Sequence, residues 1–297
     1  MIKKYIWDKV LSDYQKAKYL YYIRSVSKKK CYADYNMELI KNREFKGIHK
    51  GERVFILGNG PSLCKQDLSL LRDDYVMTTN YASKLGQFDV LNTDYHFCLD
   101  SISLLRANDS AQSNELVLKM FDLQRNQNKM PTIFVNIQGK QFVERNGLDK
   151  KYTIRYLIPS LPIDVDKRLP VDITRYVPGN FCSVVQWAIY TAIYMGFSEI
   201  YLLGVDCTNI ISDLYERTGK EADNKYAFEQ DEKSKDMNKK INTVASVEDC
   251  FRAGFKQFEV FRKIKELCEM NGVLIYNCTD GGLLDCIERK KYEELFE

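Results

Sequence analysis

Short apolar runs alternate with longer polar or amphipathic stretches from residue 53 to the end of the chain. The first run, Val54 to Leu57, places four apolar β-forming residues in a row, as in a strand that is buried on both faces of a parallel sheet. We expect strands at residues 53–57, 75–79, 94–99, 132–136, 152–158, 199–205 and 273–277. We expect helices at about 110–127, 181–195 and 247–271, and a short helix at the end of the chain. This alternation predicts an α/β fold with a Rossmann-like, mostly parallel sheet flanked by helices.

Two of the expected helices differ in their apolar pattern. The helix at 181–195 is apolar almost all round, so we expect it to be central and buried, with Gly196 ending it. The helix at 247–271 is apolar along one side and stops at Gly272. We expect its buried side to contain Phe251, Phe255, Phe258, Ile264 and Leu267.

Residues 207–246 break the alternation of strands and helices. They are polar and charged and lack a long apolar period. Segments of this length inside a compact domain are usually lids or disordered. We therefore expect a lid insertion at about 207–246.

The first 50 residues differ from the rest of the chain in charge. They hold 13 Lys/Arg against 5 Asp/Glu, a net +8, whereas the remainder holds 31 against 36, a net −5. Residues 2–26 place apolar side chains at helical spacing between lysines, which predicts a basic amphipathic helix. Three roles stay open for this helix: contact with an anionic membrane surface, packing on the domain or a neighbouring subunit, and a loosely held arm. Nucleic-acid binding is not expected, because the rest of the chain is acidic and shows no nucleic-acid motif.

The length of the chain and its cysteines indicate how many domains it has and in which compartment it folds. Its 297 residues favour one large α/β domain, 51–297, after a basic helical segment, 1–50. The nine cysteines show no C-x-x-C spacing, which indicates buried thiols in a reducing cytoplasm and neither a disulfide framework nor a zinc site. Neither a signal peptide nor a membrane-spanning run is expected.

The G-N-G-P-S turn, residues 58–62, follows the first expected strand. Gly58 and Gly60 allow backbone angles and close approaches that a Cβ would block, and Pro61 suits the first turn of a helix beside Ser62. Backbone N–H groups at a helix start attract anions, so we expect a phosphate to bind here. The alternative is a tight strand-to-helix turn without a ligand.

Two common nucleotide-binding patterns do not fit this turn. The dinucleotide fingerprint requires a third glycine and an acidic residue after the second strand, where this chain has Leu63 and Asn80. The motif G-x-x-x-x-G-K-[ST] of the P-loop nucleoside triphosphatases is absent from the sequence. We therefore expect neither NAD nor a P-loop site.

Polar residues gather at the ends of the expected strands, where ligands bind in parallel sheets. They are mostly neutral amides and hydroxyls, with Arg175 as a basic partner in a nearby loop. Such a set suits a nucleotide monophosphate sugar, whose single phosphodiester needs less charge neutralisation than a triphosphate. Asp206 has a second interpretation as a helix or turn cap. The set is Asn59, Ser62, Asn80, Asp100, Ser101, Asn180, Ser183 and Asp206.

Four strings in a fixed order carry a family resemblance: FILGNGPSL, TTNYA, GFSEIYLLGVD and KYAF. Together they resemble the bacterial sialyltransferases of glycosyltransferase family 42 and the broader MptE-like superfamily. That superfamily includes flagellin glycosyltransferases and an archaeal hydroxymethylpterin pyrophosphokinase. The resemblance covers roughly residues 53–287 and implies a GT-A-like variant of the fold.

The resemblance also implies roles for single residues. Asn59 and Asn80 match positions that hold the cytidine monophosphate (CMP) part of the donor. Ser183 falls near a hydroxyl-bearing position on the nucleotide, and Asp100 sits where the family has an amide on the donor side. Tyr226, in KYAF, matches a tyrosine that hydrogen-bonds the departing phosphate. A fixed phenol can stabilise the charge that grows on that phosphate in place of a metal, so we expect a metal-independent enzyme.

The family's general-base histidine has no counterpart here. The chain has only His49 and His96, both outside the region that follows KYAF, and we expect His96 to be structural. Glu248 and Asp249 open the long helix at about the expected place and could act instead, since partial burial raises a carboxylate pKa towards working pH. Their other interpretation is that of acidic residues favouring a helix N-terminus. Asp231, in the expected lid, is a weaker candidate.

These observations predict a cytoplasmic, inverting glycosyltransferase that transfers a sialic acid-like (nonulosonic) sugar from a CMP donor to a cell-surface glycan precursor. We expect no cofactor. The expected partners are the donor and a glycan or lipid-linked glycan acceptor; peripheral contact with the inner face of the cell membrane and a homo-oligomer stay open. Two alternatives remain. One is an MptE-like diphosphotransferase on a pterin-like substrate, and the other is a non-catalytic nucleotide-sugar-binding subunit, suggested by the missing histidine.

Overall fold

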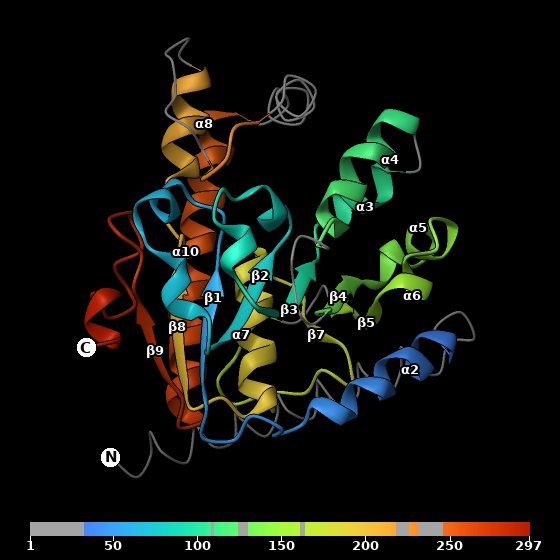
Figure 1. The fold of residues 1–297 in the computed structure, drawn as a ribbon, viewed down its shortest axis with the longest axis horizontal. Coiled ribbons are helices and arrows are strands. Elements are labelled where there is room, and N and C mark those ends of the chain that lie inside the picture. Colours follow the sequence, from blue (N-terminus) through green and yellow to red (C-terminus); the bar gives the residue numbers. More distant parts are fainter. Residues whose placement is uncertain (1–32, 108–109, 124–129, 161–163, 218–225, 231–245) are drawn as a thin grey trace.

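The main sheet of the protein contains seven parallel strands in the order β5-β4-β3-β2-β1-β8-β9 (Figure 1). The computed structural model describes residues 33–107, 110–123, 130–160, 164–217, 226–230 and 246–297. The strands are β1 (Arg53–Leu57), β2 (Tyr75–Thr79), β3 (Thr93–Cys98), β4 (Thr132–Asn136), β5 (Thr153–Leu157), β8 (Glu199–Leu203) and β9 (Leu274–Asn277), with a separate pair β6 (Pro159–Ser160) and β7 (Val177–Pro178). The predicted Rossmann-like α/β fold is thus confirmed.

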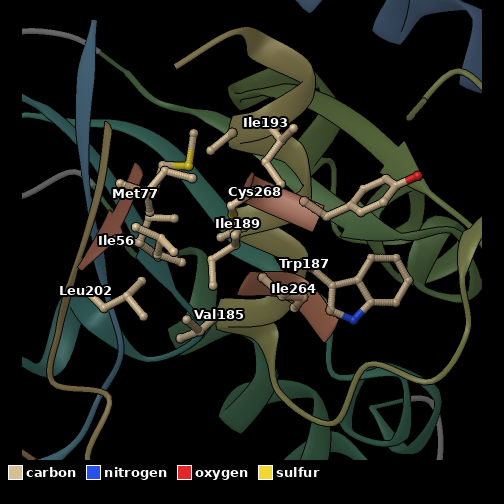
Figure 2. Packing of buried hydrophobic residues seen from close by; sticks show 14 of the residues in the cluster. Ile56, Met77, Val185, Trp187, Ile189, Ile193, Leu202, Ile264 and Cys268 are labelled. Atoms are coloured by element: carbon tan, nitrogen blue, oxygen red, sulfur yellow. The ribbon is translucent and has the colours of Figure 1, made fainter. Parts of the chain in front are cut away.

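One face of the sheet is covered by the two longest described helices. Val54 and Ile56 of β1 pack on this side with α7 (Val184–Met195), which contacts β1, β2 and β3, and with α10 (Val247–Met270), which runs along α7. Every residue of α7 from Val185 onward is buried, as predicted. Figure 2 shows this core, with Ile56, Met77, Val185, Trp187, Ile189, Ile193, Leu202, Ile264 and Cys268 labelled.

The opposite face is covered by shorter elements. Phe55 and Leu57, which alternate with Val54 and Ile56 along β1, pack here with the C-terminal Tyr292. The shorter described helices are α2 (Ala33–Ile40), α3 (Ser101–Arg106), α4 (Ala111–Leu118), α5 (Lys140–Arg145), α6 (Leu148–Lys151) and α8 (Asn209–Arg217). Among all the described helices, none has both the length and the apolar character that crossing a bilayer requires.

The G-N-G-P-S turn does not lead into the helix that the sequence predicted. A single 3-10 turn follows it at Pro61–Lys65. The side chain of Gln87 explains the break, because it donates to Gln66 O at 2.9 Å and accepts from Leu68 N–H at 3.0 Å. These backbone groups would otherwise be available to continue a helix. The C-terminal helix is likewise reduced to one 3-10 turn, Glu293–Leu295.

Phe251 and Phe255 do not lie in the core, contrary to the prediction. They are 56% and 65% exposed, whereas Ile264 further along α10 is fully buried. The N-terminal part of α10 extends beyond the sheet and lies beside α8 (Figure 1). Gly254 faces α8 there, because a Cβ at this position would lie 2.4 Å from Ile210 Cδ1. The helix therefore turns its glycine side towards its neighbour and leaves the two phenylalanines outside.

The structure describes only parts of the expected lid and of the basic N-terminal segment. Within the expected lid, residues 209–217 form α8, which packs on α10, and residues 226–230 lie beside the G-N-G-P-S turn. Residues 218–225 and 231–245 of the lid, and the basic helix expected at 2–26, lie outside the described residues. In the N-terminal segment, Asn42 follows α2 and donates to the carbonyls of Tyr156 and Ile173, which fixes this part of the segment to the domain.

His96 lies within β3 and is completely buried. Its Nε2 is 3.0 Å from Met120 O, and because a carbonyl only accepts, Nε2 carries the ring proton. Nδ1 therefore accepts from the Thr78 hydroxyl at 2.8 Å. Burial lowers the pKa of His96 to about 4. Its contacts with the core support the structural role that the sequence predicted.

We predict that His96 makes the fold sensitive to mild acid. The folded imidazole stays neutral down to its pKa of about 4, whereas the unfolded chain takes up a proton near the ordinary value of about 6.5. Stability is therefore lost as pH falls from 6.5 towards 4, and from pH 7 to pH 5 this amounts to about 2 kcal/mol. Urea denaturation at both pH values should show this loss in the wild type but not in His96→Gln. An identical pH dependence in both proteins would contradict the assignment.

Candidate functional site

The strand order places a topological switch point between β1 and β8. The chain moves outward from β1 through β2, β3, β4 and β5, and then adds β8 and β9 on the other side of β1. Open parallel sheets bind ligands beyond the carboxyl ends of the strands at such a point. A cavity of about 570 Å³ lies there, lined by residues that follow β1, β2, β3 and β8 and by the start of α7.

This cavity brings together eight of the predicted site residues. They are Gly58, Asn59, Gly60, Asn80, Asp100, Ser183, Asp206 and Tyr226. Ser62, Glu248 and Asp249 are not among the residues that line it. Thr79, Cys182, Cys207, Thr208 and Gln257 also line the cavity, although the sequence singled out none of them.

Asp206 occupies the donors that were expected to bind a phosphate at the G-N-G-P-S turn. Its carboxylate accepts from the Ser62 N–H at 3.2 Å and from the Ser62 hydroxyl at 2.8 Å. A phosphate at Ser62 would meet this carboxylate at close range, and like charges repel strongly where water is excluded. The geometry therefore does not support a phosphate at Ser62, and it gives Asp206 the role of a turn cap.

The two glycines of the turn allow the backbones after β1 and β8 to approach closely. A Cβ at Gly60 would lie 1.8 Å from Asp206 Oδ2 and 2.7 Å from Gly204 O, and a Cβ at Gly58 would lie 2.3 Å from Gly204 O. The Gly60 N–H donates to Gly204 O at 2.9 Å. Gly58 and Gly60 thus allow the chain segments after β1 and β8 to lie in contact.

The backbone of Asp206 is held from the other side by the turn at residues 280–282. The Leu283 N–H donates to Asp206 O at 2.7 Å, and a Cβ at Gly282 would lie 2.7 Å from Asp206 Cα. Arg289 fixes this turn by donating to the carbonyls of Thr279, Gly281, Gly282 and Leu284. Burial raises the pKa of Asp206, and the hydrogen bonds from Ser62 oppose that rise.

Two asparagines that line the cavity carry buried side-chain oxygens without a hydrogen-bond partner. The Asn59 Nδ2 donates to Thr79 O at 2.9 Å, and because a carbonyl only accepts, this bond fixes the orientation of the amide. Asn59 Oδ1 and Asn80 Oδ1 are both buried, and no described residue donates a hydrogen bond to either. Asn80 has a φ of +44°, so the chain turns sharply where β2 ends. Buried acceptors of this kind are costly unless a donor reaches them.

The start of α7 forms another wall of the cavity. Gln186 Oε1 accepts from the Cys182 N–H at 2.7 Å and from the Ser183 N–H at 3.2 Å. Ser183 and Gln186 are arranged as a capping box, yet among the described residues Ser183 Oγ makes no hydrogen bond of normal geometry. Ser183, Val184 and Val185 all line the cavity. The beginning of a 12-residue helix carries partial positive charge. The side of the cavity that favours an anion is therefore the start of α7.

Tyr226 reaches the cavity from a segment far along the chain. The next residue, Ala227, donates its N–H to Asn59 O at 2.9 Å, and its carbonyl accepts from Cys64 Sγ at 3.2 Å. The Tyr226 ring stacks on Phe228, with ring centroids 5.2 Å apart and an interplanar angle of 10°. Residues 226–228 of the KYAF string are thus anchored directly to the G-N-G-P-S turn.

Glu248 and Asp249 lie in the exposed first turn of α10. Asp249 Oδ2 accepts from the N–H and the hydroxyl of Ser246, at 2.9 and 2.8 Å, and forms a capping box. Glu248 pairs with Arg252 on the helix surface. These contacts match the helix-start interpretation of both residues and give no support to a role as base. Asp231 lies outside the described residues.

The other polar residues of the predicted set have structural partners. Asp100 accepts from the N–H and the hydroxyl of Ser103 at the start of α3, at 3.2 and 2.6 Å. Asn180 Oδ1 accepts from the Val165 N–H at 3.0 Å. Arg175 pairs with Asp172 at 3.3 Å and is not among the residues that line the cavity.

A smaller cavity of about 110 Å³ adjoins the first one. Asn59, Asn80, Asp100 and Tyr226 line both cavities. The other walls of the smaller cavity are Tyr81, Lys84, Ser103, Leu116, Phe228 and Gln230. The sequence pattern did not single out Lys84, although a lysine four residues after the strand-end Asn80 was a usable signal.

No protein-family model and no curated protein matches this sequence. Solved structures with a similar fold include a MAf glycosyltransferase from Magnetospirillum magneticum AMB-1 (TM-score 0.45, 12% identity), over 87% of this chain and 38% of that one. They also include the sialyltransferase CstII from Campylobacter jejuni in complex with a substrate analogue, cytidine-5'-monophosphate (TM-score 0.40, 15% identity), over 81% of this chain and 85% of that one. The chain thus spans well under half of the MAf glycosyltransferase. Both TM-scores are below 0.5, so neither likeness decides what this chain does.

We predict that Gly60→Ala destabilises the protein by about 1–3 kcal/mol, because its Cβ would overlap the Asp206 carboxylate. Gly86→Ala is the matched control, since no atom lies within 4 Å of a Cβ there, and we expect it to be neutral. Urea denaturation of both variants measures the difference. Equal stabilities of the two variants would show that the contact between Gly60 and Asp206 does not constrain the turn.

Proposed function

We propose that this protein is a glycosyltransferase that binds a CMP-activated sugar in the 570 Å³ cavity. The observation that carries the proposal is a set of three buried polar atoms, on residues that line the cavity, for which the described residues offer no hydrogen-bond partner: Asn59 Oδ1, Asn80 Oδ1 and Ser183 Oγ. Buried polar atoms without a partner call for an explanation in a native structure, and a ligand supplies one. The sequence resemblance supports the donor class, since these three residues match or lie near positions that hold the nucleotide.

The chemistry of the unpartnered atoms suits the nucleoside part of such a donor. The two asparagine oxygens only accept hydrogen bonds, so the ligand must offer donors, as ribose hydroxyls and the cytosine amino group do. A cavity of about 570 Å³ lies within the usual range of small-molecule sites. We therefore assign the nucleoside to the side of the cavity formed by Asn59 and Asn80.

The phosphate then belongs at the start of α7. Ser183 Oγ is without a partner there, and the helix start favours negative charge, whereas Asp206 disfavours it at Ser62. When the bond between the sugar and the phosphate breaks, negative charge grows on the phosphate oxygens. The Tyr226 phenol, held by the backbone bond of Ala227 to Asn59, is the group that we propose to stabilise this charge.

We also propose that the reaction proceeds without a metal ion. Within the described part of the chain, no three His, Cys, Asp or Glu side chains come together in a way that could hold a metal. The carboxylates that line the cavity, Asp100 and Asp206, both accept hydrogen bonds from serines. In this proposal the start of α7 and Tyr226 neutralise the leaving phosphate instead.

For the transfer we propose a single displacement with inversion. The acceptor hydroxyl attacks the anomeric carbon, CMP leaves, and a base takes the hydroxyl proton. Asp100 is the better candidate for this base, because it lines both cavities, whereas Glu248 and Asp249 cap an exposed helix start. A sialic acid-like donor sugar and a cell-surface glycan precursor as acceptor follow from the sequence resemblance.

One observation favours a second candidate function, a nucleotide-sugar-binding subunit without catalysis. Glu248 and Asp249, the residues predicted to replace the family's histidine, are engaged elsewhere. Such a protein would bind CMP as tightly as the enzyme, but would neither hydrolyse nor transfer the sugar.

We predict that CMP stabilises the protein more than CDP, UDP, GDP, NAD or ATP with magnesium. A ligand at a hundred times its dissociation constant adds about 2.7 kcal/mol to the free energy of unfolding. A thermal-shift series with these six ligands measures the ranking, and the CMP shift should persist in a chelator. Strong stabilisation by ATP with magnesium and none by CMP would support the diphosphotransferase instead.

We predict that Tyr226→Phe lowers the turnover of the CMP-sugar about 100-fold, because a donor to the leaving phosphate is lost. The dissociation constant of CMP should change by less than about threefold, since the ring and its stacking on Phe228 remain. Tyr215→Phe is the matched control, because this side chain is 42% exposed and is not among those that line the cavity. Unchanged turnover in Tyr226→Phe would remove this residue from the mechanism. No turnover in the wild type, with CMP still bound, would favour the non-catalytic subunit.

A further inference from the structure

The segment at residues 33–50 packs one side on the domain and leaves another side exposed. Its helix α2 continues directly into a 3-10 helix, Lys41–Phe45, so residues three positions apart lie on nearly the same side. The packed side consists of Leu39, Asn42 and Phe45, which are all buried. The exposed side consists of Met37, Ile40 and Arg43, and the turn that follows exposes Lys46, Ile48 and Lys50. These six exposed residues make up the 37–50 surface.

The three apolar side chains of the 37–50 surface project from a backbone that is firmly held. Met37 is 68% exposed, Ile48 49% and Ile40 42%. On either side of Ile48, the Gly47 and His49 N–H groups donate to the carbonyls of Tyr194 and Met195, at 3.1 and 2.9 Å. Apolar side chains that gather on one exposed surface mark contact with another molecule.

The 37–50 surface also carries an excess of positive charge. Each acidic side chain described between residues 35 and 52 has a partner: Glu38 with Lys41 and Lys140, Glu44 with Arg155, and Glu52 with His49. By contrast, Arg43, Lys46 and Lys50 form no ion pair with any described residue. Three cations therefore stand beside the three apolar side chains without a counter-charge in the described part of the chain.

The chain that leads into α2 adds charge of the same sign. Residues 1–32 hold nine Lys/Arg against two Asp/Glu, and they join α2 at Ala33. The residues after position 50 are acidic overall, with a net charge of −5. The complement of a surface that is both basic and apolar is an anionic layer with an apolar interior, as a phospholipid bilayer offers.

We propose that the 37–50 surface binds the face of an anionic phospholipid bilayer. Its apolar side chains would enter the boundary between head groups and acyl chains, and its cations would contact the lipid phosphates. The turn at 46–50 precedes the amino end of β1, whereas the 570 Å³ cavity lies beyond the carboxyl ends of the strands. Binding would therefore leave the cavity accessible from solution. This inference does not depend on the function proposed above.

The experiment measures binding of the full chain to vesicles by co-sedimentation. The wild type should bind vesicles of phosphatidylcholine and phosphatidylglycerol in equal parts, but not vesicles of phosphatidylcholine alone, and high salt should release it. The triple variant Arg43→Gln, Lys46→Gln, Lys50→Gln should bind about 100-fold more weakly, since each cation near an anionic surface contributes about fivefold. The double variant Met37→Ser, Ile48→Ser should lose about 10-fold.

A matched control removes the same charge from elsewhere on the surface. The variant Lys65→Gln, Lys265→Gln, Lys291→Gln replaces side chains that are 70%, 42% and 79% exposed, and it should bind vesicles within about twofold of the wild type. Thermal unfolding of all the variants checks that they fold. Equal losses in the two triple variants would overturn the proposal, because net charge and not this surface would then govern binding.

Three other results would also overturn the proposal. The first is undiminished vesicle binding by the Arg43, Lys46 and Lys50 variant, which would assign membrane contact to residues 1–32 alone. The second is binding to duplex RNA but not to vesicles. The third is a dimer by light scattering that Met37→Ser dissociates, without vesicle binding, since the surface would then join two copies of the chain. Vesicle binding without CMP binding would support this inference and contradict the proposed function.

Discussion

The hydrogen bonds between the Asp206 carboxylate and Ser62 hold the site together. They join the end of β8 to the end of β1 across the switch point of the sheet, over a separation of 144 residues. Gly60 allows the close approach, and Arg289 supports the opposite side of Asp206 through the turn at 280–282. The carboxylate is costly to bury, as its raised pKa shows, so its value lies in fixing the turn rather than in net stability.

The fixed turn positions Asn59 and Tyr226 in the cavity wall. Asn59 stands in the turn and donates to Thr79, so its oxygen is turned to a place where no described residue donates to it. The backbone of the same residue accepts from Ala227 and so places Tyr226. The charged group at the turn is used for architecture, whereas in the proposed function the ligand is recognised by neutral amides, a serine and a helix start. Such a division of roles would suit a singly charged, hydroxyl-rich ligand.

The sequence predicted the fold and the gathering of the candidate residues at one edge of the sheet, because both depend on local pattern. Runs such as Val54 to Leu57 mark buried strands, and parallel strands necessarily bring Asn59, Asn80 and Asp206 to one edge. The details that depend on contacts between distant segments were not predictable. Examples are the occupation of Ser62 by Asp206 and the interruption of the expected helix by Gln87. Likewise, the periodicity of α10 predicted that Phe251 lies on the buried side of the helix. It could not show that the helix extends past the sheet at this residue, which leaves Phe251 exposed.

A crystal structure of the protein with CMP tests the proposed function most directly. We expect cytidine in the large cavity, with donors within hydrogen-bond distance of Asn59 Oδ1 and Asn80 Oδ1. We also expect the phosphate at the start of α7, beside Ser183, with the bonds between Asp206 and Ser62 intact. A phosphate bound at Ser62 in place of the Asp206 carboxylate, or CMP bound outside this cavity, would contradict the proposed binding mode.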